Sequence, residues 1–497
     1  MAIVFFVLVA LLVLAVIVTA NWYVWRRLFR DTTRGPGLTR RAGAVLIAGG
    51  WVLAITALVA ERSGAPFWLQ QVLAWPGFLW LALSIYLLLA VVAGEVVRPL
   101  LRRFLERRAR AAEPRPVTRT PLAETDSGTT PGTPANTGPP SATEHLPGTP
   151  AAPQKGDAGV PGGAPAAAAV VDGQAEAGAS ASATAPHPQA DPAPAAPDSS
   201  PQPLTTPGTP DTTAPAPAPA PTGPSRRLFV SRVVAGAAAA AAVGTVGYGT
   251  YGVLRGPKVK RVTVPLAKLP RAAHGFRIAV VSDVHLGPVL GRGFAQKVVD
   301  TINATQPDLI AVVGDLVDGS VKDLGPAAAP LAQLRARHGS YFVTGNHEYF
   351  SGAEQWVEEV RRLGLDPLEN ARRELPHFDL AGVNDVTGED EGQGPDYARA
   401  LGDRDTARAC VLLAHQPVQI HDAVEHGVDL QLSGHSHGGQ LWPANFLAAA
   451  ANPTVAGLER YGDTQLYVSR GAGAWGPPTR VGAPSDITVI ELASKQA

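Results

Sequence analysis

The chain has 497 residues, 45% of them hydrophobic, and its 42 basic and 42 acidic side chains give a formal net charge of zero. Because the hydrophilic part also lacks long Lys/Arg runs, the sequence shows no basic segment of the kind that binds nucleic acid, and no nucleic-acid partner is expected. Cys410 is the only cysteine, which excludes a disulfide-stapled scaffold and a Cys-rich zinc site.

Three long uncharged runs occupy the first part of the chain, at about 2–20, 42–60 and 72–94. Each is long enough to cross the roughly 30 Å hydrocarbon core of a bilayer as a helix. Three such runs favour transmembrane helices within 1–110 over the alternative of buried core helices. The first run could instead be a signal peptide, but its basic cluster follows the apolar residues, which is typical of an anchor.

Arginines are distributed unevenly around these runs. Six lie between 26 and 41 and six more between 98 and 110, whereas the segment 61–71 carries one acid and one base. Cytoplasmic loops of membrane proteins are enriched in Lys and Arg. Both arginine-rich segments are therefore predicted to be cytoplasmic, and the amino terminus is predicted to lie outside a cell membrane that the chain crosses several times.

The segment 111–224 changes to Pro, Ala, Thr, Gly and Ser without hydrophobic periodicity. Such a composition lacks the apolar residues that offset chain entropy, so it predicts a disordered linker on the cytoplasmic side. A Pro-rich docking site for a partner is the alternative interpretation.

The segment 225–257 begins with Ser225-Arg226-Arg227-Leu228-Phe229 and continues as a weakly hydrophobic, Ala/Gly-rich run. It resembles a twin-arginine export signal, although Val230 and Ser231 depart from that pattern, and the resemblance makes the export machinery an expected partner. An uncleaved fourth transmembrane helix with an ordinary basic flank fits the same residues. Both interpretations place everything after about Lys258 on the extracytoplasmic side.

The remaining part of the chain contains short apolar runs that are each followed directly by a polar cluster. Helical patterns at 293–304 and 327–337 separate the first three runs, so the order predicts an α/β domain with its sites at the carboxyl ends of strands. The predicted strands are 276–281, 309–313, 341–343, 410–413 and 430–432.

Imidazole, carboxylate and amide side chains gather at these strand ends, and no thiol accompanies them. Such a ligand set suits a pair of divalent ions such as Mn, Fe or Zn, which one carboxylate can bridge. The Asp-x-His and His-x-His spacings are expected to direct alternate side chains to one side, and a preceding Gly leaves room for close backbone approach. The candidate residues are Asp283, His285, Asp315, Asn346, His347, His415, His435 and His437.

The motif order Asp-x-His, Gly-Asp-x-x-Asp, Gly-Asn-His-Glu, His and Gly-His-x-His resembles the calcineurin-like metallophosphoesterase superfamily. The resemblance extends from about Arg271 to Leu492 and implies a metallophosphoesterase domain over 258–497, folded as a four-layer α/β sandwich. The segments 430–440, 469–471 and 478–480 are similar to a membrane-associated bacterial branch that includes UDP-2,3-diacylglucosamine pyrophosphatase-like phosphodiesterases.

This resemblance also implies roles for individual residues. The first metal would be held by Asp283, His285 and His437, with Asp315 bridging, and the second by Asn346, His415 and His435. His347 would be catalytic, stabilising charge on the phosphate and protonating the leaving group. Asp318 and Glu348 would orient neighbouring ligands, or serve as simple turn and helix-cap residues. The other histidines of this region are interpreted as structural: His274, His338, His377, His421 and His426.

Two further segments bear on the substrate. The polar, acidic stretch 387–404 predicts a surface loop, either part of an active-site rim or simply solvated. The stretch 441–450 is unusually apolar for a segment that follows a metal motif. It predicts either a contact with lipid or an ordinary core helix.

These features predict a membrane-anchored, dinuclear metal-dependent phosphoesterase of the phosphodiesterase or pyrophosphatase type. It would act on the extracytoplasmic side, with lipid-linked or nucleotide-sugar-linked phosphoesters as expected substrates. The alternative is a membrane sensory or interaction protein that uses the same fold as a low-turnover binding domain. Transport is disfavoured, because the three apolar runs carry no ionisable side chain.

Overall fold

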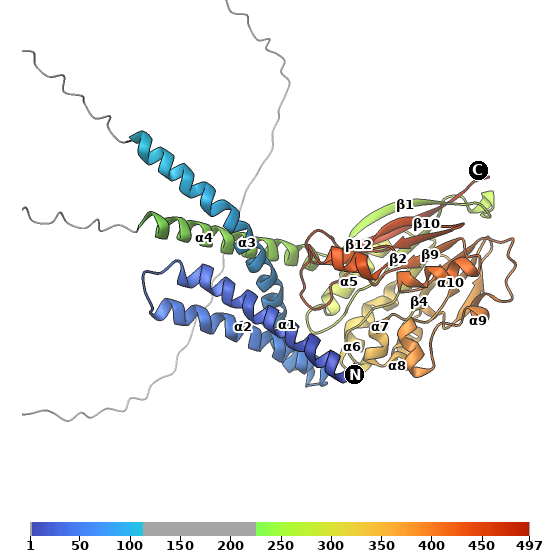
Figure 1. Ribbon diagram of the computed structural model, residues 1–497. Helices are drawn as coiled ribbons and strands as arrows, with labels where there is room; N and C mark the ends of the chain where they lie inside the picture. The colour runs from blue at the N-terminus through green and yellow to red at the C-terminus, as the bar shows by residue number, and fades with distance from the viewer. Residues whose placement is uncertain (1, 113–224, 497) are drawn as a thin grey trace, which may run out of the picture. The chain divides into compact units, whose positions relative to one another are not determined.

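The computed structural model describes residues 2–112 and 225–496, so the segment expected to be a linker lies almost wholly outside the described residues. Four long helices precede the β-strands (Figure 1). They are α1 (Ala2–Trp25), α2 (Leu38–Arg62), α3 (Phe67–Ala112) and α4 (Arg226–Leu254), with a short π-helical turn at Arg26–Arg30. All four are long and apolar enough to cross a membrane.

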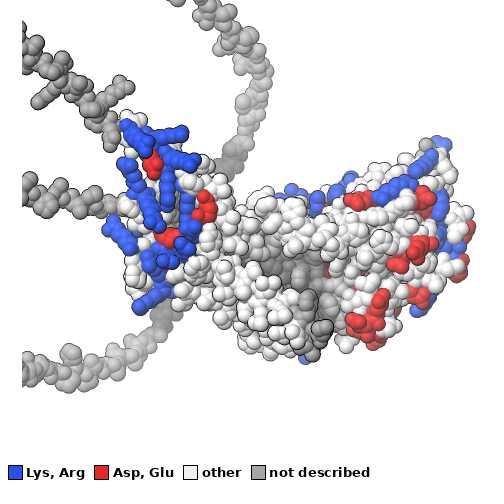
Figure 2. Space-filling model, in the orientation of Figure 1, with Lys and Arg blue, Asp and Glu red and all other residues white. Residues whose placement is uncertain are grey.

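The third helix is longer than the apolar run that predicted it. It continues through the arginine-rich segment 98–110, because Arg, Leu, Glu and Ala are good helix formers that extend a helix already begun. Figure 2 shows Lys and Arg side chains gathered at one end of these helices. Several of these arginines line one shared cavity: Arg27, Arg30, Arg34, Arg40, Arg98, Arg102 and Arg227.

Two six-stranded sheets form the centre of the carboxyl-terminal domain. The first has the order β1 (Lys258–Leu266), β12 (Asp486–Ser494), β2 (Phe276–Val281), β3 (Leu309–Val313), β4 (Ser340–Val343) and β5 (Asp366–Pro367). The second has the order β10 (Gly457–Tyr461), β11 (Thr464–Val468), β9 (Leu430–Ser433), β8 (Cys410–Leu413), β7 (Asp379–Gly382) and β6 (Ala371–Glu374). Within the sheets, β2, β3 and β4 are parallel to one another, as are β7, β8 and β9.

The two sheets pack face to face, and helices cover their outer faces. Alternate side chains of β2 show this, because Ile278 and Val280 lie in the core between the sheets whereas Ala279 and Val281 face the helices. The helices are α5 (Arg292–Ala304), α6 (Val321–Ala328), α7 (Asn346–Ser351), α8 (Ala353–Arg362), α9 (Tyr397–Leu401), α10 (Ile420–Glu425) and α11 (Asn445–Ala451). Short 3-10 turns lie at Arg271–Ala273, Ala329–Gln333, Val386–Glu391, Pro417–Gln419 and His437–Gly439. The expected four-layer α/β sandwich is confirmed.

Two local predictions were wrong. The helix expected at 327–337 is instead α6, which lies earlier and gives way to a 3-10 turn. Pro330 is the second residue of that turn, and because it has no N–H it cannot continue the α-helical hydrogen bonding. The stretch 387–404 is not simply a surface loop either, since Tyr397 and Leu401 of α9 are buried in the core outside the second sheet.

The fourth long helix ends inside the domain. Val253 is fully buried in the core outside the first sheet, and the hydroxyl groups of Thr250 and Thr479 lie 2.7 Å apart. Only three residues separate the end of α4 from the start of β1. The carboxyl-terminal part of α4 is therefore packed as an element of the domain, and no flexible tether separates the helix from the domain.

Candidate functional site

The predicted site residues all lie where strands of the two sheets end. Asp283 and His285 follow β2, Asp315 and Asp318 follow β3, Asn346, His347 and Glu348 form the first turn of α7 after β4, His415 follows β8, and His435 and His437 follow β9. Because parallel strands end at the same edge of a sheet, side chains from distant parts of the chain meet there.

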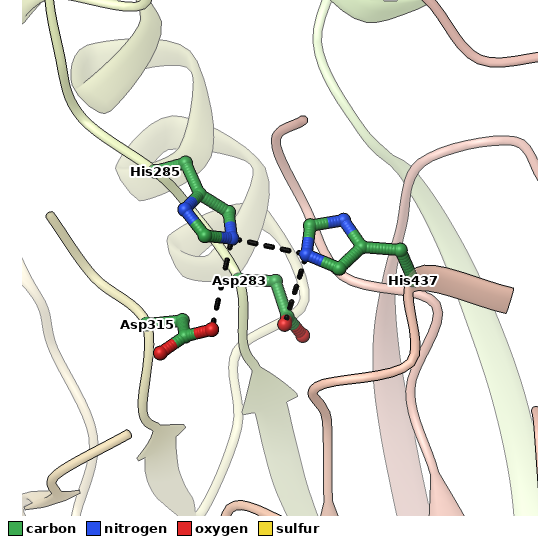
Figure 3. A group of neighbouring side chains, drawn as sticks. All are labelled: Asp283, His285, Asp315 and His437. Carbon is green, nitrogen blue, oxygen red and sulfur yellow. Dashed lines mark hydrogen bonds and ion pairs between the residues drawn. The ribbon is translucent and has the colours of Figure 1, made fainter. Parts of the chain in front are cut away.

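One group of side chains comprises Asp283, His285, Asp315 and His437 (Figure 3), and all four are buried. The Nε2 atoms of His285 and His437 lie 3.0 Å apart. His437 Nε2 is 3.3 Å from Asp283 Oδ1, and His285 Nε2 is 3.8 Å from Asp315 Oδ2. Imidazole nitrogens and carboxylate oxygens thus converge on one point, as in a metal site that uses nitrogen and oxygen ligands.

A second group shares Asp315 with the first. His415 Nε2 lies 3.1 Å from Asp315 Oδ2, and His435 Nδ1 lies 3.0 Å from the Oδ1 atom of Asn346. Ligand atoms of Asp315, His415 and His435 all lie within 4.8 Å of one another. One carboxylate therefore belongs to two clusters, which is the arrangement that a bridged pair of cations requires.

A buried polar atom inside the clusters lacks a hydrogen-bond partner in the described part of the chain, and a bound cation would complete its contacts. Within the described residues, Asp283 Oδ2 is buried without a hydrogen-bond partner, and buried polar groups rarely lack one. Burial disfavours a charged carboxylate, but His415 beside it holds the pKa of Asp315 well below its usual range. Burial, followed by the neighbouring His285 and Arg480, holds the pKa of His437 well below its ordinary value. An ionised carboxylate and a neutral imidazole are the forms that bind metal.

His347 stands beside these clusters and pairs with Asp318. Its Nδ1 atom lies 2.7 Å from Asp318 Oδ1, and the same oxygen is 2.9 Å from His285 Nδ1. Burial opposes protonation of His347, but the hydrogen bond to Asp318 and its charge raise the pKa of His347 to about 9. Cations bound nearby would oppose that increase. Phe350 and Trp475 make edge-to-face contacts with the ring, at centroid distances of 5.5 and 5.7 Å.

Glu348 connects two of the strand ends. Its buried carboxylate accepts hydrogen bonds from the backbone N–H groups of Asp315, Leu316 and Gly345, at 2.9, 2.8 and 2.6 Å. Burial and the nearby charge of Asp315 raise the pKa of Glu348 to about 7. The contact with Gly345 caps α7, and the other two fix the loop that carries Asp315. Glu348 thus makes the contacts of a helix cap and also those of a residue that orients a neighbouring ligand.

Replacing Glu348 with Gln should destabilise the domain by about 1–3 kcal/mol, because the amide NH₂ cannot accept the backbone N–H groups that one carboxylate oxygen accepts. Thermal unfolding of the full chain in detergent measures the change, with Glu358→Gln on the exposed face of α8 as the matched control. An unfolding temperature equal to that of the control would show that these hydrogen bonds are dispensable.

The backbone at the site is not extended as the strand pattern predicted. Asp283, His285, Asp315, His435 and His437 have positive φ angles of 51°, 48°, 53°, 71° and 53°. Non-glycine residues adopt this left-handed region at an energetic cost, and such residues are enriched at functional sites. The candidate ligand side chains therefore converge through left-handed turns and not through the alternation of side chains along a strand.

Glycines before three of the site residues allow close backbone approach, as predicted. A Cβ atom on Gly314 would lie 2.5 Å from His415 Nδ1 and 2.7 Å from the backbone of Gly345. A Cβ atom on Gly345 would collide with the carboxylate of Asp315, and one on Gly434 with the carboxylate of Asp283. Only glycine fits at these positions without displacing a candidate ligand.

The substitution Gly434→Ala should therefore destabilise the domain by about 1–3 kcal/mol through overpacking, and it should lower metal affinity about 10–100-fold by displacing Asp283. Thermal unfolding and metal titration of the full chain measure both effects. Gly291→Ala is the matched control, because an added Cβ there meets nothing within 4 Å. Metal affinity in Gly434→Ala equal to that of the control would contradict the proposed contact.

Sequence reasoning assigned no role to Arg480, although it lay in a family-like segment. The structure places this buried guanidinium behind His437, where it donates to the His437 carbonyl oxygen at 3.0 Å and lies 3.1 Å from Nδ1. It also donates to the carbonyl oxygens of Gly473 and Ala483. Arg480 and His437 are 43 residues apart in the sequence, so spacing alone carried no signal for their contact.

The histidines interpreted as structural lie outside the clusters that the described residues form. His338 packs against Phe276 at a centroid distance of 5.3 Å, and His426 stacks on Tyr397 at 5.3 Å. His421 makes an edge contact with Tyr461. These rings contribute packing at the surface of the sandwich.

Comparison with known proteins matches residues 276–439 to the calcineurin-like phosphoesterase family. A zebrafish "transmembrane protein with metallophosphoesterase domain" is 39% identical over 264 residues, which cover 50% of this chain and 60% of that protein. An uncharacterized metallophosphoesterase of Campylobacter jejuni is 38% identical, covering 49% of this chain and 65% of the relative. The chain thus spans less than two thirds of the length of these two proteins. One from Aquifex aeolicus is 33% identical, covering 48% of this chain and 92% of the relative.

Proposed function

Because the chain belongs to the calcineurin-like metallophosphoesterase family, we propose that it is a membrane-anchored, dinuclear metal-dependent phosphoesterase of the phosphodiesterase or pyrophosphatase type. The observation that carries the proposal is the pair of ligand clusters that share Asp315. The buried atom Asp283 Oδ2, which lacks a hydrogen-bond partner among the described residues, supports it further.

In this proposal, Asp283, His285 and His437 hold one cation, Asn346, His415 and His435 hold the other, and Asp315 bridges them. When bound, a pair of Mn, Fe or Zn ions would polarise a phosphate group and activate water for attack. The protein fixes the ligand tautomers, since His415 Nδ1 lies 2.9 Å from the Val313 carbonyl oxygen and can only donate to it. That hydrogen bond leaves Nε2 free to face Asp315.

His347 is proposed to act as the catalytic acid. Its pairing with Asp318 keeps a proton on the ring, and its position beside the clusters lets it face a bound phosphate. A protonated imidazole there can stabilise negative charge and deliver a proton to the leaving oxygen. Asp318 also holds His285 Nδ1, so one carboxylate would position both a metal ligand and the acid.

The helices and their basic ends support one membrane topology. We infer three membrane helices within 1–110, a linker at 111–224, a fourth helix within 225–257 and the catalytic domain at 258–497. The arginines that line one cavity at the helix ends would be cytoplasmic, since such residues mark the cytoplasmic side. The packing of Val253 in the domain core favours an uncleaved fourth helix over a cleaved export signal. A reporter fused at the carboxyl terminus should report the extracytoplasmic side, and a cytoplasmic signal would contradict this orientation.

Exposed apolar side chains of the domain support a lipid-linked phosphoester as the substrate. No residue of α11 is buried, and Phe446 and Leu447 are 66% and 75% exposed, so the alternative of an ordinary core helix does not hold. Tyr86 of α3 donates to the Trp442 carbonyl oxygen at 2.9 Å, next to this helix. An apolar surface beside a membrane helix suits an amphiphilic substrate. The UDP-2,3-diacylglucosamine-like branch and a nucleotide-sugar headgroup remain predictions.

Replacing Phe446 and Leu447 together with Ser should lower hydrolysis of a lipid-linked phosphodiester by about tenfold, because less apolar area would meet the acyl chains. Hydrolysis of soluble bis-p-nitrophenyl phosphate should be unchanged, since neither side chain belongs to the metal clusters. Val418→Ser and Val424→Ser, at exposed positions near α10, provide the control. Equal losses on both substrates would contradict a role in lipid recognition.

A further inference from the structure

A second cavity, separate from the metal clusters, lies between α4 and the loop before β12. Its volume is about 690 Å³. The α4 side is formed largely by Ala241, Gly244, Thr245, Tyr248, Tyr251 and Gly252, and the loop side by Arg480, Val481, Gly482, Pro484 and Ser485, with Arg255 and Lys258 completing the lining. It contains none of the residues proposed to bind metal or to act as the catalytic acid.

The α4 side of this cavity is apolar and open. A Cβ atom added to Gly244 or Gly252 would meet nothing within 4 Å, so the helix surface there is not filled by neighbouring side chains. Tyr248 and Tyr251 flank the opening and are mostly exposed. A groove with small residues along a membrane helix accommodates a hydrocarbon chain, because close approach to the helix backbone is possible.

All charged residues that line the cavity are cations. They are Arg255, Lys258 and Arg480, and no Asp or Glu lines it. Arg480 is committed to backbone carbonyl oxygens and to His437. The side chains of Arg255 and Lys258 make no hydrogen bond or ion pair with another described residue. Two free cations thus stand at the polar end of an apolar groove, which complements a negatively charged headgroup.

A buried hydroxyl group adds a polar contact point. Ser485 is 5% exposed, and its Oγ atom has no hydrogen-bond partner within the described parts of the chain. Buried hydroxyl groups are normally paired, so an unpaired one in a cavity wall indicates that a ligand supplies the partner. The backbone carbonyl oxygen of Ser485 accepts from Lys258 N, which brings the hydroxyl and the lysine to the same end of the cavity.

The order of side chains along α4 matches the depth profile of a membrane. Small apolar residues of α4 are followed by two exposed tyrosines, and Arg255 and Lys258 come just after the helix ends at Leu254. Tyrosine is enriched at the membrane interface, and basic residues contact lipid headgroups just beyond it. The cavity therefore spans the boundary between the hydrocarbon and headgroup regions of the bilayer that α4 is proposed to cross.

We propose that this cavity binds one anionic phospholipid, distinct from the substrate. The acyl chain lies along the Gly244 and Gly252 face of α4. The headgroup phosphate is held by Arg255 and Lys258 and accepts a hydrogen bond from Ser485. The proposal rests on the membrane placement of α4 but not on the hydrolytic activity of the metal site.

The test uses the full chain in nanodiscs that contain equal amounts of phosphatidylglycerol and phosphatidylcholine. Lipids retained after transfer to detergent are counted by native mass spectrometry. The wild type and Asp315→Asn should both retain phosphatidylglycerol, because the site is separate from the metal centre. The double variant Arg255→Gln/Lys258→Gln should retain about tenfold less, and Ser485→Ala should retain less than the wild type. Lys322→Gln/Arg335→Gln, which removes two exposed cations elsewhere, should behave as wild type.

Equal retention by Arg255→Gln/Lys258→Gln and its control would overturn the proposal. Equal retention of phosphatidylcholine and phosphatidylglycerol would do the same, as would displacement of the bound lipid by millimolar inorganic phosphate, which would indicate a site for free anions. Hydrolysis of bis-p-nitrophenyl phosphate is measured on the same samples. It should be unchanged in the double variant, which separates failure of lipid binding from failure of the proposed function.

Discussion

Replacing Asp315 with Asn should reduce hydrolysis of bis-p-nitrophenyl phosphate by at least about 10²–10³-fold, the loss typical when a central charged group of an active site is removed. Asp315 is the only described residue that belongs to both histidine-containing clusters proposed to hold the two cations. Its Oδ2 atom faces His415 and His285, and its Oδ1 atom accepts from the His347 backbone N–H at 2.9 Å. Asn preserves the shape of the side chain but not its negative charge.

The same substitution should lower the metal content of the purified protein, because a neutral amide cannot offset the charge of two cations. Metal analysis and initial rates on one preparation measure both effects. Asp300→Asn, on the exposed face of α5, is the matched control. A variant that keeps two metal ions and loses less than tenfold in rate would contradict the proposed bridging role of Asp315.

Replacing His347 with Gln should lower the turnover number by about 10²–10⁴-fold, the contribution typical of general acid–base catalysis. Metal content should be unchanged, since His347 belongs to neither proposed ligand set. The loss should be larger for an alkyl phosphodiester than for a p-nitrophenyl ester, because the poorer leaving group depends more on protonation.

His338→Gln is the control for this prediction, because His338 packs against Phe276 outside the site. Equal losses on the alkyl and p-nitrophenyl esters would argue against proton delivery by His347. Loss of a metal ion in His347→Gln would instead reassign this residue as a ligand.

Much of the fold followed from local pattern. The strands 276–281, 309–313 and 410–413 have the bounds that their apolar runs predicted, because short β-branched runs between polar clusters leave the chain few alternatives. The helix expected at 327–337 was misplaced. The alanines there favour a helix in isolation, but Pro330 and the packing of Leu331 set the turn that forms.

The residues of the candidate site could also be predicted from the sequence, since the polar clusters directly followed predicted strands. The geometry of the site could not be predicted in this way. Left-handed backbone at His285, Asp315 and His437 is stabilised by contacts between loops, and pattern reasoning has no access to such contacts. The position of Arg480 behind His437 and the packing of Trp475 on His347 likewise depend on loops that meet only in the folded domain.

The measurement that tests the central claim most directly is metal-dependent hydrolysis by the full chain in detergent. Chelation should abolish release of p-nitrophenol from bis-p-nitrophenyl phosphate, and addition of Mn should restore it with about two ions bound per chain. A folded protein that binds two ions but hydrolyses neither this ester nor a lipid-linked phosphodiester would contradict the assignment. That result would favour a binding domain that uses the same fold.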